Sequence, residues 1–175
     1  MQDQEVAGMY QIGEKVVYAA HGVCMVAAEE CKTVDRKKVT YLVLEPVCQE
    51  GTRYLVPTHN AAAMGKLRPM LTKEQLQELI RSEAVQADAW IRDENHRKLA
   101  YRELIGSGDS VKLMQMVHTL YGHKTKQLAE GKKIHLCDDN FLRDAERLLA
   151  GEFAIVLDIA PDAARQYLRN QLKAE

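Results

Sequence analysis

The spacing of apolar residues changes once along this chain, near Pro69. Before that point, short runs rich in β-branched and aromatic residues alternate with polar or glycine-containing breaks, and they lie at residues 16–18, 22–26, 39–44 and 53–56. This pattern is typical of short strands joined by tight turns. After Pro69, apolar residues recur every three or four positions, which is the period of an amphipathic helix. The sequence therefore predicts an α+β protein with two parts, residues 1–68 and residues 69–175.

The N-terminal part has too few apolar residues to fill the space between two packed sheets. Pro46 and Pro57 each end one of the strand-like runs, as expected where a ladder stops. Several short strands with close turns favour a small, strongly bent sheet. We therefore expect residues 1–68 to form a Tudor- or SH3-like β-barrel.

Helix-start signals recur through the C-terminal part, which predicts a compact bundle of helices joined by short loops. The signals are the capping box Thr72-x-x-Gln75, a polar start near Asp88, then Asp109, then Asp138 or Asp139, and finally Pro161. In this reading the second helix runs from near Asp88 past Trp90 to Gly106.

Charge and hydropathy exclude several classes of protein. The chain has 175 residues with 24 Lys and Arg against 25 Asp and Glu, so only a local patch could attract nucleic acid. Apolar runs are far shorter than the roughly 20 residues that span a membrane. Residues 1–5 lack the basic and apolar segments of a secretory signal. We expect a cytoplasmic protein.

The chain shows no motif for catalysis or for a cofactor. Its cysteines, Cys24, Cys31, Cys48 and Cys137, form no CxxC pair, and the spacing His21-x-x-Cys24 is not followed by a second pair at ligand spacing. We expect reduced cysteines and no metal. No nucleophile motif, phosphate-binding loop or dinucleotide fingerprint is present, so an enzyme is not expected and no cofactor is predicted.

Several segments resemble a known family in their order and spacing. They are residues 10–18 (YQIGEKVVY), 21–23 (HGV), 41–44 (YLVL) and Val56-Pro57, followed by Trp90 before a basic helix, Ser107-Gly108-Asp109, Gly131-Lys132-Lys133 and residues 144–149. This set resembles the CarD/CdnL family of transcription regulators, whose N-terminal module is similar to one in the transcription-repair coupling factor. The resemblance implies that the β-module binds the RNA polymerase β subunit. It also implies that the helical part stabilises the open promoter at the upstream edge of the transcription bubble.

The resemblance also implies site residues. Trp90 takes the position of a tryptophan that wedges into the minor groove, and Arg92 matches a basic position just after it. Apart from the resemblance, Arg97 and Lys98 make the second predicted helix locally basic, and with Arg92 we expect them to contact phosphates largely independently of sequence. For the polymerase contact we expect Lys32, Arg53 and Leu55. Family members carry arginine at the position of Leu55, and here Arg53 lies two residues back, on the same strand face. The protein is expected to act as a monomer and to reach the nucleoid through the polymerase.

Other interpretations remain open from the residues themselves. Trp90 could be a core anchor, as most tryptophans are. The basic residues around it could form a solvated helix face, and the histidines among them are expected at the surface or at helix caps. The chain could also be a Tudor-like protein-interaction module that does not act on promoter DNA. Such a module would need an aromatic cage, for which the candidates are Tyr10, Tyr18, Tyr41 and Tyr54.

Overall fold

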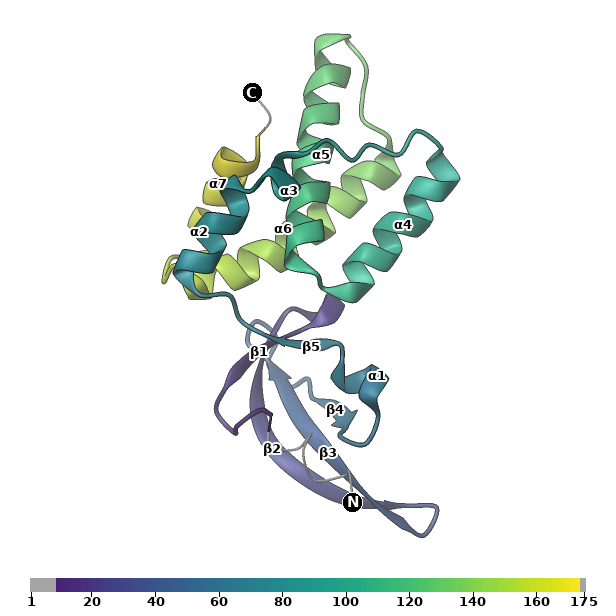
Figure 1. The fold of residues 1–175 in the computed structure, drawn as a ribbon, viewed down its shortest axis with the longest axis vertical. Helices are drawn as coiled ribbons and strands as arrows, with labels where there is room; N and C mark the ends of the chain where they lie inside the picture. The colour runs from purple at the N-terminus through teal and green to yellow at the C-terminus, as the bar shows by residue number, and fades with distance from the viewer. Residues whose placement is uncertain (1–8, 174–175) are drawn as a thin grey trace. The chain divides into compact units, whose positions relative to one another are not determined.

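The computed structural model describes residues 9–173, and the chain divides into two compact units between Met70 and Leu71. Unit 1 is β-rich and unit 2 is helical (Figure 1). The predicted α+β class is therefore confirmed, with an antiparallel sheet first and a helical region after it. Within residues 9–173, no helix is both long enough and apolar enough to cross a membrane.

Unit 1 contains one five-stranded antiparallel sheet with the strand order β4-β3-β2-β1-β5. Its elements are β1 (Lys15–Tyr18), a short 3-10 turn η1 (Ala19–His21), β2 (Val23–Val34), β3 (Lys37–Pro46), β4 (Tyr54–Pro57), α1 (Ala61–Met64) and β5 (Leu67–Pro69). The strands β4 and β5 lie at the two edges of the ladder. The sequence did not predict α1 or β5, because a single helical turn and a three-residue strand carry no periodic signal.

The β2–β3 hairpin is longer than the sequence predicts. Its ladder continues from Cys24 opposite Pro46 to Val34 opposite Lys37, and the turn consists of Asp35 and Arg36. Both turn residues have positive φ, at 49° and 65°, as a tight two-residue hairpin turn requires. Polar and exposed residues occupy the far end of the hairpin, and a register shift between residues 26 and 28 interrupts the alternation. Because of these two features, the periodicity of the sequence does not predict the far end of β2.

Side chains from all five strands and α1 bury one face of the sheet. This core consists of Val16, Cys24, Val26, Leu42, Leu44, Val56, Met64 and Leu67. Alternate residues on a strand point to opposite faces. Val43 and Leu55, which lie between core residues on β3 and β4, therefore belong to the opposite face, which we call the outer face.

Unit 2 is built from six helices around a second core. The helices are α2 (Lys73–Arg81), α3 (Glu83–Gln86), α4 (Glu94–Ser107), α5 (Ser110–Ala129), α6 (Leu136–Val156) and α7 (Pro161–Leu172). The capping box at Thr72 and Gln75, the cap at Asp109 and the helix start at Pro161 are confirmed. Local signals of this kind succeed because each involves residues within one turn of one another.

Two of the predicted helix starts are wrong. The second long helix begins at Glu94, not near Asp88, because the Asp93 carboxylate accepts a hydrogen bond from the His96 backbone N–H at 2.7 Å and caps the helix there. Residues 87–93 form a loop instead. In α6 the N-cap position belongs to His135, and Asp138 lies inside the first turn with a different partner.

Candidate functional site

The three residues predicted to bind polymerase lie on the outer face of unit 1. Val43 pairs with Leu55 across β3 and β4, and Arg53 lies two residues before Leu55. On β2, Ala28 pairs with Val43. Lys32 lies four positions after Ala28 and so shares its face. The fold therefore places residues that are distant in sequence on one surface.

Glu30 links the two cations of this surface, and the sequence reading missed it. Arg53 Nη2 donates to Glu30 Oε1 at 2.9 Å, and Lys32 Nζ lies 3.5 Å from Glu30 Oε2. Arg53 Nε also lies 3.5 Å from Glu45 Oε1. The hydrogen bond from Arg53 is the main cause that lowers the pKa of the Glu30 carboxyl. All four side chains are partly exposed, so these ion pairs orient the charges more than they stabilise the fold.

Leu55 adds an apolar contact at the edge of the sheet. Its side chain is 41% exposed while its neighbour Val56 is fully buried, as expected for residues that point to opposite faces of the sheet. It lies on β4, and within residues 9–173 β4 pairs only with β3. An edge strand with one unpaired side can accept a further strand from another protein.

A second candidate site surrounds the loop of residues 87–93 in unit 2, between α3 and α4. We call this segment the Trp90 loop. The Ala89 N–H donates to Thr119 Oγ1 on α5 at 3.1 Å, and the Trp90 N–H donates to Asp88 Oδ1 at 3.2 Å. Gln115 on α5 donates to the Ala87 carbonyl at 3.4 Å. Side-chain partners thus stabilise the first half of this loop.

The Trp90 indole is half-buried and packs against the core of unit 2. It stacks on the His123 imidazole of α5, with ring centroids 3.5 Å apart and an interplanar angle of 14°. Arg97 also covers the ring, with its Cζ 4.3 Å from the ring centroid. This burial matches neither the exposed wedge nor the core anchor fully, because the ring is neither solvent-facing nor completely buried.

His123 was expected at the surface or at a helix cap, and the structure places it against the indole instead. Burial is the main cause that lowers the pKa of its imidazole. The Asp138 carboxylate raises this pKa, while Arg97, His135 and Lys126 lower it further. The net direction favours the neutral ring, which stacks without bringing another buried positive charge next to Arg97.

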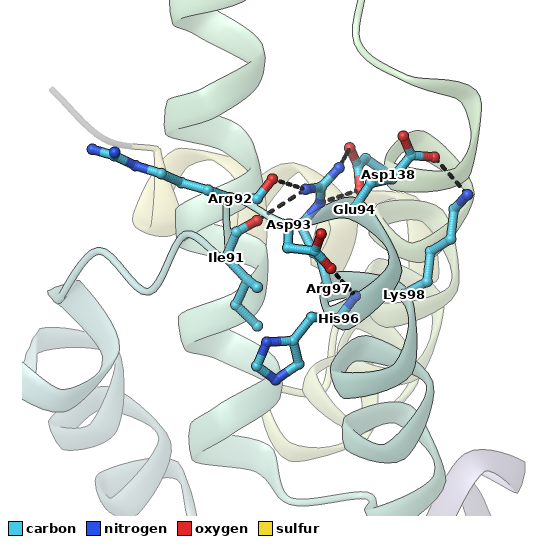
Figure 2. Close-up of polar contacts among 8 residues, drawn as sticks. All are labelled: Ile91, Arg92, Asp93, Glu94, His96, Arg97, Lys98 and Asp138. Carbon is cyan, nitrogen blue, oxygen red and sulfur yellow. Dashed lines mark hydrogen bonds and ion pairs between the residues drawn. The ribbon is translucent and has the colours of Figure 1, made fainter.

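Arg97 is buried, with only 3% of its side chain exposed, and it faces inward from α4 (Figure 2). Its Nε and Nη2 donate to the two carboxylate oxygens of Asp138 at 2.8 Å and 2.9 Å. Asp138 is itself 0% exposed. The hydrogen bonds that Arg97 donates to Asp138 are the main cause that raises the pKa of the Arg97 guanidinium. The expected phosphate contact by Arg97 is therefore corrected, because this guanidinium is already occupied by a buried carboxylate.

The same guanidinium reaches the second half of the Trp90 loop. Arg97 Nη1 donates to the Ile91 carbonyl at 2.9 Å and to the Arg92 carbonyl at 3.4 Å (Figure 2). Nothing in the linear sequence links Arg97 with Asp138, which lies 41 residues away. The doublet Asp138-Asp139 at a helix start was the only sequence signal there, and it was read as a cap.

Arg92 and Lys98 lie at the surface, and their contact with phosphate stays a prediction. The Arg92 side chain is exposed and extends away from the cluster in Figure 2, and no hydrogen bond or ion pair engages its guanidinium in the described part of the chain. Lys98 Nζ lies 2.5 Å from Glu94 Oε1, in an i,i+4 pair with both side chains more than one-third exposed. Surface pairs of this kind open at little cost, so Lys98 is available to a stronger anion.

A cavity of about 390 Å³ opens beside the indole. Its lining comes from the Trp90 loop and one face of α5, and consists of Asp88, Trp90, His118, Thr119, Gly122, His123 and Lys126. The cavity leaves one part of the indole accessible, although His123 and Arg97 cover the ring. The part of the indole that borders this cavity is open to a partner, with Lys126 nearby.

Residues 10–70 match the family model described as the CarD-like/TRCF RID domain. The matched segment begins before β1 and ends at Met70, the last residue of unit 1. Unit 1 is therefore a CarD-like/TRCF RID domain, in agreement with the resemblance to the CarD family found in the sequence.

Proposed function

We propose that this chain, with its CarD-like/TRCF RID domain, is a transcription regulator that binds RNA polymerase through unit 1 and promoter DNA through unit 2. The single observation that carries the polymerase-binding role is the family match over residues 10–70, and the DNA contact of unit 2 is proposed from the arrangement around Trp90. In this account the polymerase β subunit is the protein partner. The chain takes no part in chemistry and acts by stabilising the open promoter.

The outer face of unit 1 supports the polymerase contact. Arg53 and Lys32 present donors beside Glu30, and Leu55 adds an exposed apolar side chain at the edge of the sheet. Addition of a strand to β4 would supply backbone hydrogen bonds, and the side chains of the outer face would supply specificity.

The Trp90 loop supports the DNA contact. An apolar ring beside exposed cations fits the minor groove at a base step that is already distorted, as architectural proteins use it. Arg92 and Lys98 contact phosphates, which fixes position and carries no sequence information. Because the net charge of the chain is −1, its affinity for DNA alone should be weak, and the polymerase has to deliver it to the promoter.

The alternative of an aromatic cage on unit 1 has little support from the geometry. The Tyr18, His21 and Tyr54 rings contact one another, with centroid separations of 4.3–5.6 Å. A methylated ammonium would need to lie between such rings, within about 6 Å of each centroid. These three side chains form one contacting cluster, and neither Tyr10 nor Tyr41 adds a ring contact to it in the described part of the chain.

The polymerase contact can be tested by a pull-down of the isolated β subunit with the full-length chain. Arg53→Glu places a third carboxylate beside Glu30 and Glu45, and Leu55→Glu removes the apolar contact while keeping the backbone donor. Both variants should lose binding. Lys73→Glu is the matched control, because it makes the same charge change at the exposed first residue of α2, where a negative charge suits the helix. Full binding by both outer-face variants would reject this surface.

A further inference from the structure

We infer that Arg97 and Asp138 form a positioning pair that holds the Trp90 indole in place, and that Arg97 does not contact DNA. This inference gains its functional meaning from the proposed role of Trp90. It assigns no new contact with DNA and instead identifies what orients the residue that makes one.

One guanidinium connects three parts of unit 2. Its bidentate hydrogen bonds to Asp138 link it to α6. Its Nη1 donates to the Ile91 and Arg92 carbonyls, and the group lies over the Trp90 ring. These carbonyls directly follow Trp90 in the chain, so they determine how the backbone leaves the indole. Loss of the guanidinium would release the second half of the loop and uncover the ring at the same time.

The geometry requires arginine at this position. A guanidinium has five donors in one plane, so it can serve a carboxylate fork, reach two carbonyls and lie over an aromatic ring. A lysine ammonium keeps the charge but provides neither the fork nor a flat surface. His123 completes the arrangement from α5, and its stacking alone does not engage the loop backbone.

The arrangement is more than a buried ion pair that stabilises the core. A buried pair can often be replaced by apolar residues of similar volume without loss of stability, because the cost of desolvating both charges disappears too. Such a replacement would leave the Ile91 and Arg92 carbonyls without their donor. A positioning role and a stabilising role therefore make different predictions for the same double variant.

The test uses the fluorescence of Trp90, which is the only tryptophan in the chain. The full-length variants are Arg97→Lys and the double variant Arg97→Met with Asp138→Leu, and Arg102→Lys on the exposed surface of α4 is the matched control. Far-UV circular dichroism and thermal melting report whether each variant is folded. In the folded double variant we expect emission at longer wavelength and an acrylamide quenching constant raised by about twofold, because local opening exposes the ring. Arg102→Lys should match the parent.

Each outcome decides the inference. If the folded double variant keeps the parental fluorescence, whatever its melting temperature, the pair does not position the indole. If Arg97→Lys is folded and keeps the parental quenching, the charge suffices and the fork is not needed, which also contradicts the inference. These measurements use the free protein, so they do not depend on DNA. A shifted fluorescence together with an unaltered open-complex lifetime in Trp90→Ala would leave the positioning pair intact and reject the proposed DNA role alone.

Discussion

The Arg97 guanidinium lies over the Trp90 ring, with its Cζ 4.3 Å from the ring centroid. The same side chain is 3% exposed and donates bidentate hydrogen bonds to the Asp138 carboxylate. The indole is therefore part of an ordered cluster before any partner arrives. A ring that is already oriented loses less conformational entropy when it inserts at a base step than a mobile one would.

Replacing Trp90 by alanine should lower stability by an intermediate amount. A fully buried tryptophan typically costs about 3–5 kcal/mol when truncated to alanine. Because Trp90 is half-buried, we expect about 1–3 kcal/mol in chemical unfolding. Trp90→Phe keeps a flat ring against His123 and should lose less. A cost near zero would mean that the stacked arrangement does not persist in solution.

Removing the Asp138 carboxylate should be much more damaging. Asp138→Ala leaves the buried Arg97 charge without its partner, and breaking a buried pair from one side costs about 3–5 kcal/mol. Asp144→Ala makes the same substitution at an exposed position of α6 and should leave the unfolding free energy nearly unchanged. Equal stability of the two variants would show that the Arg97–Asp138 pair is not formed.

Stability should fall in mildly acidic solution in a way that depends on His123. Burial lowers the pKa of this imidazole in the folded state, so the unfolded chain binds the proton more readily. Stability is therefore fully present above the unfolded pKa of about 6.5 and is lost as the pH falls below it. His123→Phe keeps a stacking ring without the titration and should show a shallower loss between neutral pH and about pH 5.5. His21, whose pKa is also lowered by burial, contributes equally in both proteins.

Alanine substitutions at Arg92 and at Arg97 should have different effects. Arg92→Ala should keep the parental melting temperature, because its side chain is exposed and makes no hydrogen bond or ion pair in the described part of unit 2. It should reduce the salt dependence of the promoter complex by about one unit of logarithmic slope, as loss of one phosphate contact does. Arg97→Ala should instead lower the melting temperature. An unchanged salt slope in Arg92→Ala would remove this residue from the DNA-contacting set.

The sequence predicts the parts of this fold that depend on local signals. The helices starting after Thr72 and Asp109 and at Pro161 were recognisable because each cap involves neighbours in the chain. The predicted start of α4 was wrong because the Trp90 loop contains Ala, Trp and Ile at spacings that also suit a helix. The helix starts after Asp93 because the Asp93 carboxylate accepts a hydrogen bond from the His96 backbone N–H. This side-chain hydrogen bond favours a cap at Asp93 over a helix that extends further toward the N-terminus.

The candidate site was harder to predict than the fold because it depends on contacts between distant residues. Arginine is almost always exposed, and only a buried carboxylate from elsewhere in the chain makes burial of Arg97 favourable. That carboxylate is 41 residues away, in a doublet that also looks like a helix cap. Strand alternation predicts from the sequence alone that Arg53 and Leu55 share one face, whereas the polymerase contact of Lys32, Arg53 and Leu55 stays a prediction.

The lifetime of the open promoter complex tests the central claim most directly. RNA polymerase, promoter DNA and the full-length chain are combined, a competitor is added, and the decay is compared for the parent and for Trp90→Ala. A stacking aromatic contributes about 1–3 kcal/mol per base, so the variant should shorten the lifetime by about fivefold or more while still binding the polymerase. If folded Trp90→Ala, bound to the polymerase, gives the same lifetime as the parent, Trp90 does not contact the promoter and the proposed DNA role is wrong.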